Sequence, residues 1–172
     1  TITFNSTVNS YDNTSARTLT VTTGDSGVGT VTFNGAVGGT NVLGNTSVTA
    51  ATLVTAAPNT LTVSGGTFTM AGNNLTLTTD DITLAGAMTG TNTLTIQPRT
   101  ASTTMGVAGA AGTLALSTAE LNLISNGFAM INLGSLSGTG KVTVAAYTFN
   151  DHVSLRSAGT SSSGIEFTGA VS

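Results

Sequence analysis

Threonine alternates with an apolar residue in several short segments, and this alternation constrains the fold more than any other feature of the chain. The clearest examples are residues 18–22, 60–63, 74–78, 93–96 and 141–144. Successive side chains of a β-strand point to opposite faces of a sheet. Each segment therefore predicts a short strand with one buried face and one solvent-exposed face. Breaks rich in Gly and Asn separate the segments and are typical of turns, for example residues 24–27, 65–66 and 72–74.

Two short sequence words recur along the chain. The first has an apolar residue, a polar residue, a Phe or Leu and then small polar residues, and its main copies span residues 2–8, 31–37, 82–88, 147–153 and 165–171. The second resembles Leu-Thr-Val and is centred at Leu19, Leu61, Leu75, Leu94, Leu114 and Val142. Their spacing favours a repeat of roughly 14 to 21 residues with loops of variable length.

Such repetition predicts an all-β fold, namely a β-solenoid of irregular coils in which residues 1–172 form a single segment. A solenoid stacks similar strands in register about 4.8 Å apart, which favours the same residue at the same place in successive coils. The recurring Phe4, Phe33, Phe149 and Phe167 fit this arrangement. Val, Ile, Leu and Phe should then face inward and Thr outward. A β-sandwich is the alternative, because regularly spaced short strands and turns also fit that fold.

Residues 117–125 depart from the strand pattern. Ser117 and Glu120 have the Ser-x-x-Glu spacing of a capping box, and an apolar group follows at Leu121, Leu123 and Ile124. The segment predicts a short helix of about two turns. A further strand is the alternative interpretation.

Composition excludes several functional classes. The 172 residues include four Lys or Arg, seven Asp or Glu, one His and no Cys, so that only 6% of them are charged. The lack of Cys excludes disulfides and Cys-ligated metals. Four scattered basic residues cannot form a phosphate-binding patch, so nucleic acid is not an expected partner. No apolar run approaches the ~18 residues of a membrane-spanning helix, so we expect no transmembrane segment.

Residues 30–40, 113–121, 127–128, 138–140 and 149–151 contain words that are similar to those of a known family. They resemble the repeat regions of filamentous-haemagglutinin-like adhesins, which are very large bacterial surface proteins, and the resemblance covers most of the chain. It implies a right-handed parallel β-helix that is secreted across an outer membrane and serves as a long stalk or adhesive fibre. The resemblance therefore implies an extracellular, cell-surface location.

The candidates for catalysis or metal binding are few. Asp80 and Asp81 are adjacent carboxylates, but neighbours in a strand point to opposite faces and cannot easily share an ion. His152 lies beside Asp151 without a recognisable nucleophile, and Glu120 is explained by the capping box. We therefore expect no catalytic residue, no metal site and no cofactor, and we expect that the protein is not an enzyme. A polysaccharide-active β-helix enzyme is the third hypothesis, and it would need carboxylates that converge in one groove.

Repeated Thr-x-Thr pairs raise a second functional hypothesis, a surface that binds ice or a glycan. These pairs begin at Thr18, Thr30, Thr60, Thr67, Thr76 and Thr93. Their unequal separations argue against one flat face. The chain also has no Trp, and only two Tyr, to stack on sugar rings.

The two ends of the chain carry the same word. We therefore predict an end-to-end stacking interface that consists of Ile2, Phe4, Val8, Ile165, Phe167 and Val171. Open strand edges attract further strands, and neither end shows a polar or helical cap. The leading hypothesis is a structural segment of an extracellular bacterial fibre or adhesin. Its partners would be further copies or repeats of itself, and it would also contact a host cell, a neighbouring cell or a glycan.

Overall fold

The computed structural model describes most of the chain. The described residues are 2–12, 14–15, 17–22, 31–33, 35–38, 40–41, 43–49, 60–63, 68–69, 72–160 and 162–172, with the backbone alone for 60–63 and 68. They contain one helix, α1 (Thr118–Leu121), and sixteen short strands. The strands are β1 (Ile2–Phe4), β2 (Leu19–Thr22), β3 (Val31–Phe33), β4 (Thr46–Thr49), β5 (Thr60–Val63), β6 (Phe68–Thr69), β7 (Leu75–Thr78), β8 (Asp81–Leu84), β9 (Met88–Thr89), β10 (Thr93–Gln97), β11 (Met105–Val107), β12 (Leu114–Leu116), β13 (Met130–Gly134), β14 (Val142–Val144), β15 (Val153–Arg156) and β16 (Ile165–Phe167).

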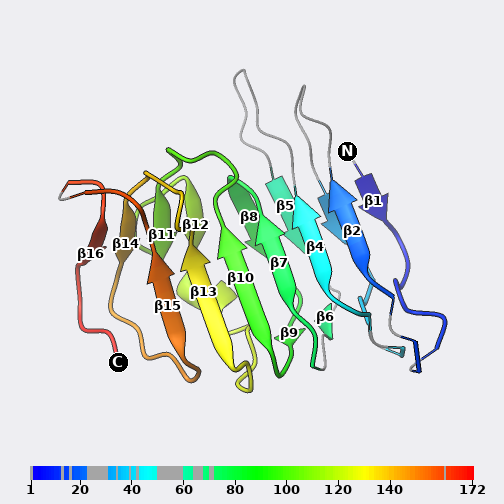
Figure 1. Ribbon diagram of the computed structural model, residues 1–172. Helices are drawn as coiled ribbons and strands as arrows, with labels where there is room; N and C mark the ends of the chain where they lie inside the picture. The colour runs from blue at the N-terminus through cyan, green and yellow to red at the C-terminus, as the bar shows by residue number, and fades with distance from the viewer. Residues whose placement is uncertain are drawn as a thin grey trace.

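The strands form sheets that run along an elongated molecule (Figure 1). The six-stranded sheet has the order β15-β13-β10-β7-β4-β2. Opposite it lie the N-terminal sheet, β1-β3-β5-β8, and the C-terminal sheet, β12-β11-β14-β16, which adjoin where β8 contacts β12. A narrow third row contains the pair β6-β9 and three isolated parallel bridges, Val8–Val37, Met88–Ile124 and Tyr147–Val171.

Every strand pair in the described part of the chain is parallel. The protein is therefore mostly β with parallel sheets, which confirms the predicted class. The antiparallel pairs that a β-sandwich requires do not occur among these strands. Of the expected turns, residues 72–74 form one, with a positive φ of 75° at Gly72, whereas 24–27 and 65–66 lie outside the described residues.

The separation between paired residues corrects the repeat length expected from the sequence. Leu75 pairs with Leu94 19 residues later, but Leu94 pairs with Ile131 37 residues later. The expected repeat of roughly 14 to 21 residues therefore fits the turn from β7 to β10 and is too short for the turn from β10 to β13. The cause is that the Leu-Thr-Val words belong to different sheets, since Leu19, Leu75 and Leu94 lie in the six-stranded sheet while Leu114 and Val142 lie in the C-terminal sheet.

Copies of the first sequence word pair with each other at the N-terminus, as expected, but not near the C-terminus. Ile2 and Phe4 pair with Val31 and Phe33, as expected. Near the C-terminus, however, residues 165–167 pair with 142–144, not with 147–149. Both segments have the apolar-polar-apolar pattern, so alternation alone could not distinguish between them.

The hydrophobic core lies between the facing sheets, where inward residues stack in continuous rows. One row of the six-stranded sheet contains only aliphatic side chains: Val21, Val48, Leu77, Ile96, Leu133 and Leu155. Thr residues of β7 and β10 alternate with them and face outward, with partial exposure. The alternation therefore places Thr on the wet face and aliphatic residues in the core, as expected.

Asparagine side chains join neighbouring strands just before the six-stranded sheet. The Oδ1 atom of Asn45 accepts a hydrogen bond of 3.0 Å from the Asn74 backbone N–H. The Oδ1 atom of Asn74 accepts one of 3.1 Å from the Thr93 backbone N–H. These bonds satisfy backbone donors where the sheet begins, so the Asn-rich breaks help to hold the strands in register.

The short connection between β11 and β12, which we call the β11-β12 excursion, does not follow from the sequence repeats. These two strands pair in parallel although only six residues connect them, whereas parallel strands usually need a dozen or more. The connection turns sharply at Ala108 and Gly109, which have φ values of 61° and 84°. A side chain at Gly106 would place its Cβ 2.0 Å from the Ala110 carbonyl oxygen. Glycine at this position therefore allows the close crossing of the two backbones.

The helix expected in residues 117–125 is confirmed at its start and is shorter than expected. Ser117 caps α1, and the reciprocal bonds of a capping box with Glu120 are both present. The helix ends at Leu121 after four residues. It stops because the next residues pair with β9: the Leu123 carbonyl accepts the Met88 N–H, and Ile124 forms a parallel bridge to Met88. No helix of the described residues has the length and apolar character to cross a membrane.

Candidate functional site

The two ends of the molecule are the candidate functional site. β1 and β2 are the outermost strands at one end, and β16 and β15 are the outermost strands at the other. Each has a hydrogen-bonded strand partner on one side only among the described residues. Unpaired backbone donors and acceptors at such an edge can bind a further strand. We call the two surfaces the N-terminal end and the C-terminal end.

At the N-terminal end, the expected interface residues Ile2, Phe4 and Val8 are all half-buried and pack against the core. Ile2 and Phe4 belong to the edge strand β1, and Val8 belongs to the third row. Leu19 of β2 is also half-buried at this end. The sequence predicts that Leu19 lies in a strand, but its position at the end follows only from the pairing of β2 with β4.

At the C-terminal end, the apolar rows reach the surface. Ile165 and Phe167 are 42% and 56% exposed, although their partners Val142 and Val144 are buried. Val171, the third expected residue, is half-buried and bridges to Tyr147. The structure thus brings Ile165, Phe167 and Val171 to one end and Ile2, Phe4 and Val8 to the other.

Sequence analysis missed two residues at the C-terminal end, Val153 and Leu155. They are the inward residues of the edge strand β15, and they are half-buried against the core. The alternation Val153-Ser154-Leu155 was a usable signal. Residues 147–153 also fit the first sequence word, so Val153 belongs to two overlapping patterns.

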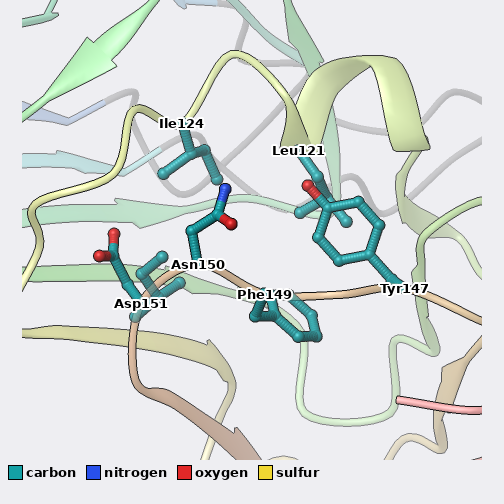
Figure 2. A pocket seen from close by; sticks show the side chains of 7 residues that line it. Leu121, Ile124, Tyr147, Phe149, Asn150 and Asp151 are labelled. Atoms are coloured by element: carbon teal, nitrogen blue, oxygen red, sulfur yellow. The ribbon is translucent and has the colours of Figure 1, made fainter. Parts of the chain in front are cut away.

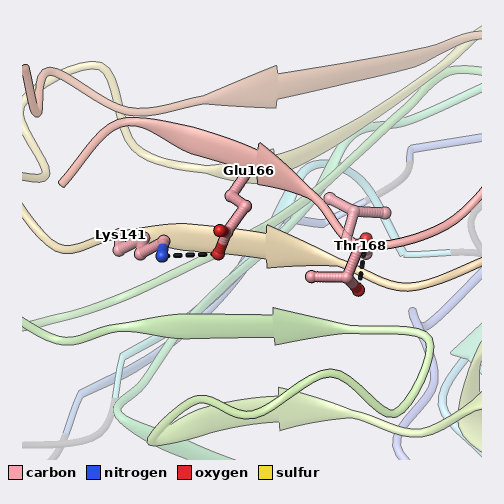
Figure 3. Close-up of polar contacts among 4 residues, drawn as sticks. Lys141, Glu166 and Thr168 are labelled. Carbon is pink, nitrogen blue, oxygen red and sulfur yellow. Dashed lines mark hydrogen bonds and ion pairs between the residues drawn. The ribbon is translucent and has the colours of Figure 1, made fainter. Parts of the chain in front are cut away.

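The outer face of β16 carries a charged pair (Figure 3). Lys141 Nζ lies 2.5 Å from Glu166 Oε2, and both side chains are partly exposed. An exposed ion pair of this kind contributes at most about 1 kcal/mol to stability. Close by, Thr168 Oγ1 donates a hydrogen bond of 3.3 Å to the Val144 carbonyl and fixes the chain after β16.

The adjacent carboxylates Asp80 and Asp81 do not share a site. Asp80 is only 6% exposed, and its two oxygens accept four hydrogen bonds from Arg99, Thr100 and Thr103. Asp81 belongs to β8 and pairs with Thr60. No group of three His, Asp or Glu residues in the described ranges is placed to hold a metal ion. Asp80 therefore organises the turn between β10 and β11.

The carboxylates of Glu120 and Asp151 also have structural roles. Glu120 closes the capping box with one carboxylate oxygen, and with the other it accepts a hydrogen bond of 3.0 Å from the Leu84 N–H of β8. Asp151 accepts hydrogen bonds from the Gly127 and Phe128 N–H groups. His152 is exposed, and its carbonyl accepts the Ile131 N–H. The carboxylates of Glu120 and Asp151 are therefore engaged in hydrogen bonds that hold neighbouring segments together.

A small cavity among the described residues is partly enclosed (Figure 2). It lies between α1 and the segment after β14 and is lined by Leu121, Ile124, Ile131, Tyr147, Phe149, Asn150 and Asp151. Its volume of about 20 Å³ is enough for about one water molecule. The cavity is therefore too small for a sugar ring or another organic ligand.

A flat Thr surface would have to lie on the outer face of the six-stranded sheet. One outward row reads Thr20, Ser47, Thr76, Thr95, Asn132 and Ser154, and the next reads Thr22, Thr49, Thr78, Gln97, Gly134 and Arg156. The first row thus loses its Thr residues over β13 and β15, and the second row already loses them at Gln97 of β10. The regular part covers β2, β4 and β7, where a shallow depression of about 350 Å³ is lined by Thr18, Thr20, Asn45, Thr46, Ser47, Asn74 and Thr76.

Comparison of the chain with protein-family models, with curated proteins and with solved structures finds no match.

Proposed function

We propose that this chain is a segment of an extracellular bacterial fibre or adhesin, and that it stacks end to end as a rigid stalk. In this proposal the parallel sheets and the third row form the three faces of a right-handed parallel β-helix. The parallel register of every described strand pair and the stacked aliphatic rows support it. The resemblance to filamentous-haemagglutinin-like repeats supports the location and the mechanical role.

One observation carries the proposal: the inward apolar rows of the C-terminal sheet continue to its edge strand, β16. Ile165 and Phe167 extend the buried rows of Val142 and Val144, yet they are exposed on the edge strand. Exposed apolar surface on an open edge favours association, because a further strand would satisfy the backbone and bury the side chains. The same fold would continue through the contact. The length of the stalk would then depend on the number of stacked segments.

The low charge agrees with a packed fibre. Only 6% of the residues are charged, and the Lys141–Glu166 ion pair lies on the outer face of the C-terminal sheet. Burying an end of this molecule therefore requires little removal of water from charged groups. Contact with a cell surface or a glycan would come from many weak contacts along the fibre.

The stacking is tested with the purified chain by sedimentation over a range of concentrations and by negative-stain electron microscopy. We expect concentration-dependent growth of unbranched filaments. The double variant Ile165→Lys and Phe167→Lys should stay monomeric, because two charges would enter the contact. The control is Leu136→Lys, since Leu136 is 74% exposed but lies in the turn after β13. This control should assemble like the wild type. A wild-type chain that stays monomeric throughout would overturn the proposal.

The location is tested separately by labelling intact source cells with antibodies and gold particles. Antibodies against the folded chain should decorate the cell surface or fibres that extend from it. Label that appears only after the cells are permeabilised would contradict the proposed location, whatever the result of the assembly experiment.

A further inference from the structure

Three neighbouring strands of the six-stranded sheet, β2, β4 and β7, carry outward rows of uncharged polar side chains (Figure 1). The first row is Thr18, Asn45 and Asn74, and the second row is Thr20, Ser47 and Thr76. The third row is Thr22, Thr49 and Thr78. We call these three rows the hydroxyl array. The unequal sequence separations argued against such a face, but the loops between the strands absorb them and the strands pair in register.

The hydroxyl array is neutral and accessible to solvent. Its side chains are exposed or partly exposed, and none of them is charged. The Thr20, Ser47 and Thr76 hydroxyls make no hydrogen bond to another of the described residues, whereas Thr78 Oγ1 accepts one of 3.0 Å from Gln97 Nε2. Each free hydroxyl can donate one hydrogen bond and accept two. The charge of the array therefore suits a neutral, hydrogen-bonding occupant.

The shallow depression on this face is the trough between the first two rows. It is lined by the side chains of both rows and by Thr46, which turns inward between them and is only 2% exposed. Its volume is about 350 Å³. Water takes about 30 Å³ per molecule in the liquid, so the trough has room for on the order of ten water molecules. Such a line of water would have hydroxyl and amide partners on both sides.

The repeat distances of the array are close to those of ice. Neighbouring strands lie about 4.8 Å apart, and outward residues of one strand repeat at about 6.6 Å. In ice each oxygen has four tetrahedral neighbours at about 2.75 Å, and this geometry gives repeats of about 4.5 Å within a layer and about 7.3 Å across the layers. The mismatch is about 0.3 Å per strand and about 0.7 Å per row. Rotation of free hydroxyl side chains can absorb differences of this size.

We infer that the hydroxyl array binds ice, with a line of ordered water in the trough as part of the contact. A sugar would be the other neutral occupant, but the rows contain no aromatic side chain on which a sugar ring could stack. The inference goes beyond the proposed stalk and does not depend on end-to-end stacking, since the array lies on the outer face of the sheet.

The test is to grow ice slowly in a solution of the purified chain and to compare the protein concentration in the ice with that in the remaining liquid. We expect the wild type to enter the ice and to inhibit its recrystallisation. Thr76→Lys should raise the concentration needed for inhibition about tenfold or more, because a charge would have to lose water at the contact. Thr20→Lys on β2 should have the same effect.

The matched control is Thr83→Lys. Thr83 is exposed in the middle of β8, on the N-terminal sheet, so the same substitution changes a different face. This variant should behave like the wild type towards ice, and circular dichroism should show that all three variants are folded. A wild type that is excluded from growing ice would overturn the inference. Equal losses for folded Thr83→Lys and Thr76→Lys would also overturn it.

Co-sedimentation with microcrystalline cellulose examines the sugar alternative. We expect the wild type to remain in the supernatant. A wild type that is excluded from ice but sediments with cellulose, and loses this binding in Thr76→Lys, would overturn the inference and assign the array to a neutral polysaccharide. Filament formation is measured separately by sedimentation of the chain alone, so failure of the stalk proposal would leave the result on ice unaffected.

Discussion

Phe4 lies face to face on Phe33, with ring centroids 4.7 Å apart and ring planes only 4° apart. Isolated aromatic pairs prefer offset or edge-to-face arrangements. Here the two rings occupy paired positions on β1 and β3, so the strand spacing of about 4.8 Å sets their separation. Phe33 is completely buried, whereas Phe4 belongs to the edge strand and is only half-buried.

This difference predicts unequal effects of two identical substitutions. Phe33→Ala should lower the free energy of unfolding by about 3–5 kcal/mol, because it leaves a cavity in the core. Phe4→Ala should lower it by only about 1–2 kcal/mol, because less apolar surface leaves the core. Urea unfolding of both variants, carried out where the chain is monomeric, measures the two values. Equal losses would show that the N-terminal end is as well packed as the interior.

The sequence predicted the strands better than their partners. Alternation found Leu75–Thr78 and Thr93–Gln97, because each has one buried and one wet face. The capping box at Ser117 was found because two residues at a fixed spacing are enough to define it. The β11-β12 excursion was missed because it depends on close backbone approach at Gly106, which no hydrophobic period reveals.

The candidate site was predicted only in part, for a related reason. Ile165 and Phe167 were assigned to an end because their word repeats the N-terminal one. Val153 and Leu155 were missed because the sequence distance to a parallel partner varies widely. Leu94, for example, pairs with Leu75, 19 residues before it, and with Ile131, 37 residues after it. The alternation of apolar and polar residues within a strand determines which face of the sheet each side chain lies on. Only the lengths of the loops decide which strand lies at the edge.

Asp80 gives a prediction about polar groups in the core. Its Oδ1 atom accepts hydrogen bonds from the Arg99 and Thr100 N–H groups and from Thr103 Oγ1, and its Oδ2 atom accepts one of 2.6 Å from Thr100 Oγ1. Asp80→Ala should cost about 3 kcal/mol or more, because two buried backbone donors lose their acceptor. Asp80→Asn retains Oδ1 and should cost about 1 kcal/mol, since Thr100 Oγ1 can instead accept from the amide.

Thermal unfolding of the Asp80 variants provides the measurement, and Asp12→Ala is the control. Asp12 accepts a comparable set of bonds from Thr14 and Ser15, but in an exposed turn where water can replace them. The control should therefore unfold close to the wild type. If Asp80→Ala also unfolded like the wild type, the buried hydrogen bonds would not stabilise the turn between β10 and β11.

Tyr147 gives a prediction about pH. Burial raises the pKa of its phenol above the ordinary value of 10.0, and the neutral hydroxyl donates a hydrogen bond of 3.0 Å to Asn122 Oδ1. The folded state thus favours the protonated form. This contribution to stability is fully present below pH 10, the pKa of the unfolded chain, and is lost as the pH rises through the higher folded-state pKa.

The measurement is an absorbance titration of the Tyr11→Phe variant, in which Tyr147 is the one remaining tyrosine. Tyr11 is almost fully exposed, so its replacement should leave the fold unchanged. We expect a midpoint above 10.0 in the folded protein and a lower midpoint in urea. A folded-state midpoint at or below the urea value would contradict the predicted direction.

Asn132 gives a prediction of increased stability. It lies in an outward row of the six-stranded sheet but is only 4% exposed, and among the described residues its Oδ1 atom is the buried side-chain atom without a hydrogen-bond partner. Its Nδ2 group donates to Thr95 Oγ1 at 3.1 Å. A buried acceptor without a partner costs about 1–3 kcal/mol, which exceeds the roughly 0.5–1.5 kcal/mol gained from one typical bond.

Asn132→Thr should therefore stabilise the protein by about 1 kcal/mol, which corresponds to an increase in Tm of roughly 2–4 °C. Threonine suits a strand, matches Thr95 on the neighbouring strand, and can still share a hydroxyl hydrogen bond with it. The control Asn132→Asp has nearly the same shape but would bury a charge, so it should lower the Tm. A lower Tm for Asn132→Thr would mean that the amide oxygen contributes to the fold. In that case the outward row over β13 would be specified by the amide, and its interruption of the Thr pattern would be a structural requirement of that strand.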